Sequence, residues 1–301
     1  MVTEKSILIK NWIARFNSLF HYMLYPIHRE VPTDYLSIVA CIKDEGPYLK
    51  EWIEYHKLIG VTRFYLYDAA TDNSKEVLTP YINDGLVVYH LATERGCQTQ
   101  CYNAALSKYR YKSRWMAFID VDEFIVSVTD KKYLPDFLKD YESYPALGIN
   151  WITYDSNGHV SKPDGLVIKN YTRVHSNPNI WENTHIKSIV NPRKTVCYLS
   201  GHEAFYNPFS KSKYAVDENC DIILGGGHTT ENHTAKIRIN HYYSKSKEEY
   251  LKKCGRGNVD SLSNLTYSDE FVTFADPAYD DTMENYICRL NHLLDESVDI
   301  L

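Results

Sequence analysis

Two aspartates one residue apart, Asp120 and Asp122, follow directly on an apolar run at residues 115–119. Unpaired carboxylates beside a buried strand are costly, so they need a partner that neutralises them. Mg²⁺ and Mn²⁺ are such partners, because proteins hold them with one or two carboxylates together with phosphate oxygens of a substrate. A cation here would stabilise a departing nucleotide diphosphate as a Lewis acid. The pattern predicts a diphosphate-metal site, and a loop of solvated acids is the alternative interpretation.

Four further charged residues are candidates for contacts with a nucleotide diphosphate. Asp68 ends a second apolar run, and acids at such strand ends commonly accept hydrogen bonds from a ribose or base; a simple turn is the alternative. Lys245, Lys253 and Arg256 follow late in the chain. Lys and Arg are the usual partners of phosphate, so these three are predicted to clamp the diphosphate, although a solvated surface would show the same residues.

Acids in the second half of the chain are candidates for a catalytic base. A base that takes a proton from an acceptor hydroxyl is usually a carboxylate or a histidine. Glu203 is the preferred candidate, with Asp155 and Glu182 as the others; each would otherwise be a surface acid. Trp151 and Trp181 are predicted to stack on sugar rings, and burial in the core is the alternative for both.

The elements that must position these residues alternate from residue 35 onward. Short apolar runs separated by helical stretches are typical of βαβ units and a mostly parallel sheet. Strands are predicted at 36–42, 63–67, 86–90, 115–119, 147–153, 165–170 and 187–190, and helices at 47–59, 74–81, 98–109 and 280–294. Ligands of open α/β sheets bind at the carboxyl ends of the strands, which is where the aspartate pair falls. A loop is predicted at 225–233.

Composition and charge narrow the class of protein. The chain has 301 residues with 33 Lys and Arg against 39 Asp and Glu, so no positive field would hold nucleic acid. Seven cysteines without a C-x-x-C pair argue against a zinc site or a disulfide framework and favour a reducing compartment. No apolar run approaches the length of a membrane span. The sequence therefore predicts a cytoplasmic protein, either soluble or peripheral on the inner face of a membrane.

The chain divides into a short N-terminal segment and one large domain. Residues 1–34 are predicted to contain an amphipathic helix, and residues 35–301 to form the α/β domain. Within that domain, 35–145 would bind the nucleotide and 146–301 the acceptor. The helix at residues 5–24 would either lie in a membrane interface or pack on the body of the protein or on a second subunit.

A set of motifs in one order resembles glycosyltransferase family 92. The resemblance runs over residues 36–257 and rests on CIKDE at 41–45, LKEWIEYH at 49–56, GV at 60–61, YD at 67–68, DVDEF at 120–124, NW at 150–151, GH at 158–159, KSIVNP at 187–192 and NHYYSKS at 240–246. It implies a GT-A fold, inversion at the anomeric carbon, a divalent metal such as Mn²⁺ or Mg²⁺, and UDP-galactose as donor. The chain departs from the family's usual Asn and Ser after the Tyr-Asp pair, where it has Ala69 and Ala70.

The resemblance also implies roles for residues inside these motifs. His241 matches a late histidine that serves as a further metal ligand in many GT-A enzymes, and a core histidine beside Tyr242 is the alternative. Two residues of the first motif, Lys43 and Glu45, are assigned to the donor together with Asp120. Substrate binding is assigned, alongside Trp151, to His159 and Lys187 within these motifs and to His202 outside them.

The expected function is a metal-dependent inverting transfer of a hexose, with galactose from UDP-galactose as the preferred donor. A surface glycan, a lipopolysaccharide or another lipid-linked glycan would supply the acceptor hydroxyl. A glycoside hydrolase also uses two carboxylates, but those flank the scissile bond about 5 to 9.5 Å apart, and acids one residue apart suit a shared metal better. A non-catalytic glycan-binding protein is the other alternative, and it would have no use for the aspartate pair.

Overall fold

The computed structural model describes residues 15–24, 31–69, 71–92, 97–256 and 271–296. Ten strands form one central sheet: β1 (Asp34–Ile42), β2 (Arg63–Asp68), β3 (Val87–Leu91), β4 (Ser113–Phe118), β5 (Glu123–Ser127), β6 (Ala146–Thr153), β8 (Ile186–Val190), β11 (Ala215–Val216), β12 (Ile222–Ile223) and β13 (Ile237–His241). Two small antiparallel sheets pair β7 (Arg173–His175) with β14 (Pro277–Tyr279) and β9 (Thr195–Tyr198) with β10 (Ala204–Tyr206).

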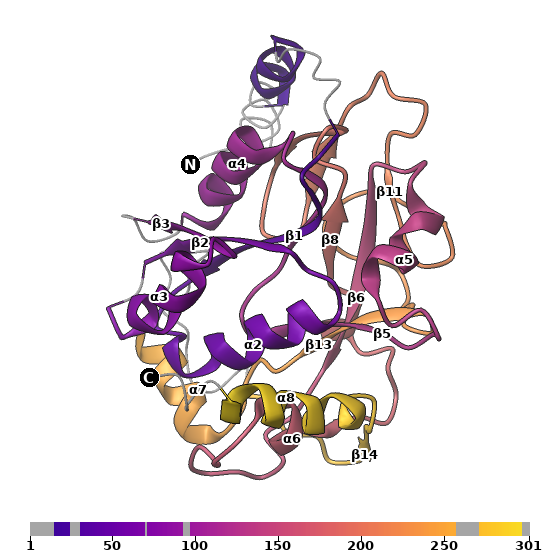
Figure 1. Ribbon diagram of the computed structural model, residues 1–301. Coiled ribbons are helices and arrows are strands. Elements are labelled where there is room, and N and C mark those ends of the chain that lie inside the picture. The colour runs from indigo at the N-terminus through magenta and orange to yellow at the C-terminus, as the bar shows by residue number, and fades with distance from the viewer. Residues whose placement is uncertain (1–14, 25–30, 70, 93–96, 257–270, 297–301) are drawn as a thin grey trace, which may run out of the picture.

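The helices lie on both sides of this sheet (Figure 1). They are α2 (Gly46–Leu58), α3 (Ser74–Asn83), α4 (Gln98–Tyr109), α5 (Leu134–Leu138), α6 (Val167–Asn170), α7 (Lys247–Arg256) and α8 (Glu284–Glu296), with short 3-10 turns η1 (Lys139–Tyr141) and η2 (Trp181–Thr184). The order of the central sheet is β12-β11-β6-β8-β4-β1-β2-β3, and β13 pairs with both β5 and β6. Strands β1 to β4 are all parallel to one another, whereas β8 enters antiparallel between β4 and β6.

Alternation along β1 explains why this strand is apolar throughout. Ile38, Ala40 and Ile42 pack in the cluster that contains the α2 residue Trp52. Val39 and its odd-numbered neighbours face the opposite side, where they pack with α4. Successive side chains of a strand point to opposite faces, so a strand covered by helices on both faces reads as a continuous apolar run. The predicted α/β fold, a Rossmann-like, mostly parallel central sheet flanked by helices, is confirmed.

The structure differs from the sequence prediction at several elements, among them a segment near residue 167 and two strands at the aspartate pair. Residues 165–170 were predicted as a strand, but the structure has the short helix α6 at Val167–Asn170. The buried carboxylate of Glu51 explains it, because it accepts hydrogen bonds from the backbone N–H groups of Val167 and Ile168 and so caps the first turn. The strands β5 and β13, which enclose the aspartate pair, were not predicted.

Helix α2 fixes the strand that follows the aspartates. The indole of Trp52 donates a 2.9 Å hydrogen bond to the carbonyl of Glu123, and the hydroxyl of Tyr55 donates a 2.8 Å bond to the carbonyl of Ile125. Both donors are fully buried. Buried hydrogen bonds of this kind are lost only at a cost of about 1–3 kcal/mol, so α2 holds β5 in a defined place below the candidate site.

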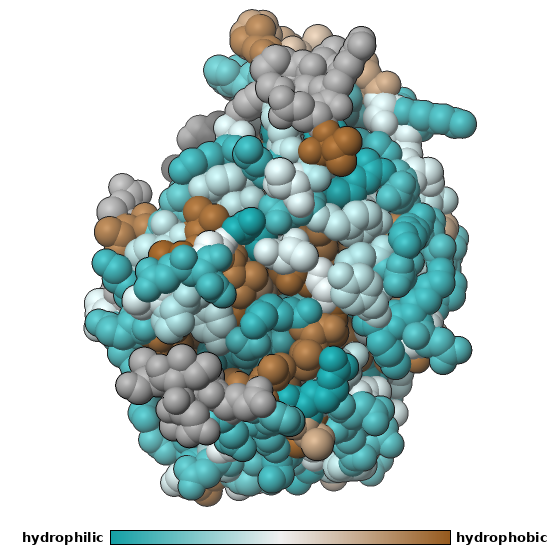
Figure 2. All heavy atoms as spheres, viewed as in Figure 1, coloured by the Kyte–Doolittle hydropathy of each residue, from teal (hydrophilic) through white to brown (hydrophobic). Residues whose placement is uncertain are grey.

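Residues 15–24 form a helix at one end of the molecule, at the top of Figure 1. Its Tyr22 donates a hydrogen bond to the carbonyl of Arg193, while Arg110 lies over the ring. The apolar side chains that point away from the body are Phe16, Phe20, Met23 and Leu24. Figure 2 shows apolar surface at this end of the molecule. Residues 5–14 of the predicted helix lie outside the described part of the chain.

Candidate active site

Asp120 and Asp122 lie in the turn between β4 and β5. Strand β13 runs antiparallel to β5 and parallel to β6, which sets His241 opposite Glu123 on one side and beside Thr153 on the other. The backbone carbonyl of Asp122 also accepts a 2.8 Å hydrogen bond from the amide of Tyr242. The strand register thus brings the late histidine against the aspartate turn.

Asp122 is buried and has two different partners. Its Oδ2 atom lies 2.7 Å from Nζ of Lys253, a residue of α7, and its Oδ1 atom lies 3.7 Å from Nε2 of His241. Burial alone would raise the pKa of Asp122, but nearby charge, above all that of Lys253, outweighs burial and lowers that pKa. Burial lowers the pKa of His241 to about 3, so its imidazole is neutral at pH 7. A neutral ring nitrogen beside a charged carboxylate is the protonation state that a metal requires.

Asp120 is held by residues from two other elements. Its Oδ1 atom accepts hydrogen bonds from the Gln98 amide at 2.8 Å and the Tyr102 hydroxyl at 3.4 Å, both from α4. Its Oδ2 atom lies 2.8 Å from Nζ of Lys187, which comes from β8 and is only 1% exposed. The same ammonium group lies 3.9 Å from the carboxylate of Glu123. The buried lysine therefore bridges the acids at both ends of the motif.

The charges at this turn favour an anionic ligand. Burial raises the pKa of Glu123, and the neighbouring aspartates raise it further against the effect of Lys187. Lys245 is the third buried or half-buried lysine here; its Nζ lies 4.6 Å from the centre of the Tyr48 ring and donates to the carbonyl of Tyr242. Three lysine side chains thus gather near the two aspartates, an arrangement that suits a diphosphate.

The residues predicted to contact the nucleotide lie at the carboxyl edge of the parallel strands. Asp68 is the last residue of β2, in register with Ile42 of β1, and its buried carboxylate accepts a 2.8 Å hydrogen bond from Tyr89. Lys43 and Glu45 follow in the loop after β1, half-buried and buried. Their contact with a nucleotide stays a prediction.

A cavity of about 490 Å³ opens on the other side of His241. Its described lining is mostly aromatic and contains no Lys or Arg; it consists of Trp151, Thr153, Trp181, Glu182, His185, His241, Tyr243, Phe271, Val272, Thr273 and Phe274. The Trp151 ring lies 4.1 Å from the ring of His241 and is stacked on His185 at 5.0 Å. Trp181 is 67% exposed and stacks on His228. Both tryptophans are thus available to a ligand in the cavity, as the sugar-stacking prediction requires.

The three candidate bases fall in different surroundings. Glu182 lines the cavity. Glu203, which the sequence favoured, is not in the described lining, and its carboxylate lies 3.7 Å from Arg15 of the N-terminal helix. Asp155 is buried and accepts hydrogen bonds from Arg173 and from the backbone of Phe274, so it fixes a wall of the cavity. Of the three, only Glu182 shares a cavity with His241 in the described part of the chain.

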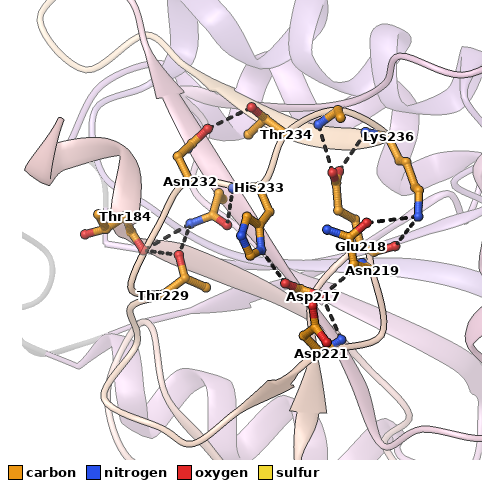
Figure 3. Close-up of polar contacts among 12 residues, drawn as sticks. Thr184, Asp217, Glu218, Asn219, Asp221, Thr229, Asn232, His233, Thr234 and Lys236 are labelled. Carbon is orange, nitrogen blue, oxygen red and sulfur yellow. Dashed lines mark hydrogen bonds and ion pairs between the residues drawn. The ribbon is translucent and has the colours of Figure 1, made fainter. Parts of the chain in front are cut away.

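A polar network connects Thr184, at the end of the turn η2 that also contains Glu182, with the segment that leads into β13 (Figure 3). The carboxylate of Glu218 accepts hydrogen bonds from three successive backbone N–H groups at residues 235–237, where β13 begins. The adjacent Asp217 bonds to His233 in the same segment. The carbonyl of Thr184, at the end of η2, accepts a 2.9 Å bond from the amide of Thr229. These hydrogen bonds therefore hold η2 and the start of β13 in a fixed relative position.

The remaining predicted residues lie around this centre. His202 contacts Trp151 in a T-shaped arrangement, and burial lowers the pKa of its imidazole to about 3. His159 bonds to the carbonyl of Asn170 and is not in the described cavity lining. Arg256 ends α7, and its side chain lies outside the described part of the chain.

The fit of a divalent cation can be judged from the atoms of Asp122 and His241. Oδ1 and Nε2, 3.7 Å apart, are too distant for a hydrogen bond, yet a cation about 2.1 Å from each atom can join them. No three Asp, Glu, His or Cys side chains converge on one point in the described residues. Asp120 is instead directed at Gln98 and Lys187. The two residues therefore fit a cation that takes its other ligands from substrate phosphate and water.

Several site residues were missed in the sequence. Gln98 and Tyr102 have no charge, and only the i, i+4 spacing on α4 places both against Asp120. His185 lies next to a motif but outside it. Glu123 was visible inside its motif, yet its burial, and hence its raised pKa, follows from the strand β5 that was not predicted.

The fold and site place the protein in a known class. A model of glycosyltransferase family 92 matches residues 37–270, and the chain belongs to this family. The resemblance seen in the motifs is confirmed. A glycosyltransferase family 92 protein of Arabidopsis thaliana is 26% identical over 169 residues, which cover 52% of this chain and 28% of the relative.

A second similar protein carries a more specific name. Galactan β-1,4-galactosyltransferase GALS2 of Arabidopsis thaliana is 33% identical over 127 residues, 36% of this chain and 24% of the relative. The chain thus spans about a quarter of the length of these relatives. Among solved structures, Staphylococcus aureus TarS 1–349 matches at a TM-score of 0.36 with 13% identity, over 52% of this chain and 47% of that one.

Proposed function

We propose that this protein is a metal-dependent inverting hexosyltransferase that moves galactose from UDP-galactose to a hydroxyl group of a glycan. The observation that carries the proposal is the 3.7 Å separation of Asp122 Oδ1 from His241 Nε2, next to Lys253 and Lys187, which each contact one of the two aspartates. An anionic donor with a bound cation satisfies both features. Family membership and the galactosyltransferase name of a relative support the choice of reaction and sugar.

The chain's own residues have distinct tasks in this reaction. Lys187, Lys245 and Lys253 bind and orient the diphosphate, while Asp68, Lys43 and Glu45 contact the rest of the nucleotide. Asp122 and His241, with Asp120 beside them, would hold Mn²⁺ or Mg²⁺, which would supply Lewis-acid stabilisation of the leaving diphosphate. In the donor's absence, Lys253 keeps the buried Asp122 carboxylate neutralised.

Glu182 is proposed as the base, in place of Glu203 or Asp155. It takes the proton of the acceptor hydroxyl as that oxygen attacks the anomeric carbon from the face opposite the diphosphate, which inverts the configuration. Trp151 and Trp181 support the acceptor's sugar rings on either side of His185. The described lining contains no Lys or Arg, so it favours a neutral sugar over a phosphorylated one.

Attachment to a membrane surface is part of the proposal. The exposed residues Phe16, Phe20, Met23 and Leu24 form one apolar face of the helix at 15–24. Such a face can lie in the interface of a bilayer that holds a lipid-linked glycan. No helix in the described part of the chain combines the length and apolar character needed to cross a bilayer. A surface glycan or a lipopolysaccharide belongs to the acceptor class proposed here.

A donor and acceptor screen tests the proposal. The protein is incubated with UDP-, GDP- and CMP-sugars, with Mn²⁺ or with a chelator, in the presence of neutral and acidic oligosaccharides. We expect nucleotide release only with UDP-galactose, Mn²⁺ and a neutral acceptor, and NMR of the product should show an inverted anomeric configuration. Hydrolysis of a glycan without any nucleotide would indicate a glycoside hydrolase and overturn the proposal.

A further inference from the structure

Three buried thiols lie beside the aspartate turn and have no part in the proposed reaction. Cys97 and Cys101 belong to the first turn of α4, and Cys41 is near the end of β1. All three pack in one apolar cluster. The Sγ atoms of Cys97 and Cys101 are 3.6 Å apart, and Sγ of Cys41 lies 4.0 Å from the carbonyl of Gln98. The remaining cysteines of the described chain lie elsewhere, at Cys197, Cys220, Cys254 and Cys288.

The spacing of the first pair is compatible with a disulfide. Cys97 caps the helix and Cys101 is four residues on, where the amide of Cys101 donates a 2.8 Å bond to the Cys97 carbonyl. Helical geometry sets Cα atoms at this spacing roughly 6 Å apart. Disulfides span Cα separations of roughly 4.4–6.8 Å. The two sulfur atoms are already in contact, but Cβ atoms at this spacing are roughly 5–6 Å apart and a disulfide needs about 3.5–4.5 Å, so the turn has to tighten when the bond forms.

The chemistry of Cys101 favours it as the attacking thiol. A hydrogen bond from Cys41 lowers the pKa of Cys101 to about 7 against the opposing effect of burial. The same hydrogen bond, together with burial, raises the pKa of Cys41, so Cys41 stays a thiol. The thiolate is the nucleophile in thiol–disulfide exchange, and a pKa near the ambient pH is optimal for attack.

The same helical turn carries the residues that hold Asp120. Gln98 and Tyr102 are one residue further along than the cysteine pair, and both bond to the Asp120 carboxylate. A covalent link from residue 97 to residue 101 tightens this turn, because the two sulfur atoms must move from 3.6 Å to a bond of about 2.05 Å. The amide of Gln98 moves with the turn, so the bond to Asp120 changes.

From this geometry we propose that Cys97 and Cys101 form a reversible disulfide that weakens donor binding at the adjacent aspartate turn. The oxidant is a low-molecular-weight disulfide. The Cys101 thiolate attacks it and releases one thiol; Cys97 then loses its proton and attacks the mixed disulfide, which releases the second thiol. Two protein thiols are oxidised and one small disulfide is reduced to two thiols. The effect on the donor depends on the proposed function, whereas the disulfide itself does not.

The experiment treats the full chain with oxidised glutathione, maps disulfides by mass spectrometry and measures the affinity for UDP with Mn²⁺ before and after dithiothreitol. We expect a link between Cys97 and Cys101 and a UDP affinity reduced roughly tenfold, the equivalent of one lost hydrogen bond to a charged group, with full recovery on reduction. Cys101→Ser should bind UDP like the reduced protein and resist the oxidant, while Cys288→Ser should respond like the unmodified chain.

The possible failures are distinguishable. If the reduced protein does not bind UDP with Mn²⁺, the proposed function fails, and disulfide mapping still decides whether the thiols react. A link of Cys101 to Cys41, the absence of any link, or a link that leaves UDP affinity unchanged would overturn the disulfide proposal. So would a Cys101→Ser variant that loses UDP affinity on oxidation as much as the unmodified protein does.

Discussion

Lys253 contacts the same carboxylate of Asp122 whose other oxygen faces His241. The ammonium group is 2.7 Å from Oδ2 and lies 3.7 Å from the centre of the Tyr243 ring, so its position is fixed by both neighbours. A lysine at this place neutralises a buried acid before a donor arrives and can then contact the donor's phosphate. Lys253 therefore contributes both to the stability of the aspartate turn and to the affinity of that turn for an anion.

Replacing this lysine should weaken donor binding without removing it. We expect Lys253→Met to lower UDP affinity in Mn²⁺ roughly tenfold, because one charge-assisted hydrogen bond to phosphate is lost. Lys252→Met is the matched control, since Lys252 pairs with Glu248 on the exposed side of the same helix. Isothermal titration with UDP measures both variants. Equal affinities for the two would contradict a role of Lys253 in donor binding.

Removing the proposed base should affect turnover and spare the donor. We expect Glu182→Gln to lower kcat by roughly 100-fold or more with UDP affinity unchanged, because general-base catalysis contributes about 10²–10⁴-fold. Glu203 is not part of the described cavity lining, so Glu203→Gln should retain most of the enzyme's activity. Steady-state rates of UDP release measure both variants. A normal kcat for Glu182→Gln, together with a large loss for Glu203→Gln, would restore the prediction made from the sequence.

Removing the exposed indole of Trp181 at the cavity should weaken acceptor binding and leave donor binding unchanged. Trp181→Ala is expected to raise the acceptor KM roughly 2- to 10-fold, in line with aromatic stacking of about 0.5–1.5 kcal/mol. Phe209→Ala removes another exposed ring, 73% accessible, that is not part of the described lining. Kinetics with an oligosaccharide acceptor compare the two. An unchanged KM for Trp181→Ala would remove the stacking platform from the account.

Stability should fall as the pH is lowered through the range of histidine titration. Burial lowers the pKa of His56 to about 3, well below the value of about 6.5 for an unfolded chain. Between these values the unfolded state binds a proton that the folded state does not, so stability is complete above about pH 6.5 and is lost toward pH 3. One such histidine contributes a slope of up to about 1.4 kcal/mol per pH unit.

Urea denaturation at pH 7, 6 and 5 checks this dependence. We expect His56→Leu to be less stable at pH 7 but to lose stability less steeply as the pH falls. Some loss of stability with acid should remain in this variant, because burial also lowers the pKa of His202 and His241 to about 3. His292→Leu, on the last helix, is the control. A decline as steep in His56→Leu as in the unmodified chain would show that His56 takes up its proton while folded.

Much of the fold could be predicted because β1 to β4 and their helices carry local patterns. Asp120 and Asp122 were found from a buried strand and two acids. The partners of these acids could not be found in the same way. Lys187 and Lys253 are far along the chain from the aspartates, and only the pairing of β8 with β4 and the packing of α7 bring them within 2.8 and 2.7 Å.

The catalytic base could not be identified from the sequence for a similar reason. Glu203, Asp155 and Glu182 are similar as sequence positions, since each is an acid in a polar region close to an aromatic residue or a histidine. Contacts with residues far away in the sequence place these three acids in different surroundings. Arg173 buries Asp155, Arg15 of the N-terminal helix pairs with Glu203, and η2 leaves Glu182 at the cavity. Motif spacing does not report such contacts.

The most direct test of the account is the dependence of UDP binding on Mn²⁺ in Asp122→Ala. The unmodified protein should bind UDP tightly with Mn²⁺ and at least tenfold more weakly with a chelator, and Asp122→Ala should remove this difference while remaining folded by circular dichroism. Asp136→Ala, at an exposed position paired with Lys139, should behave like the unmodified protein. UDP affinity in Asp122→Ala that still rises with Mn²⁺ as it does in the unmodified protein would contradict the central claim.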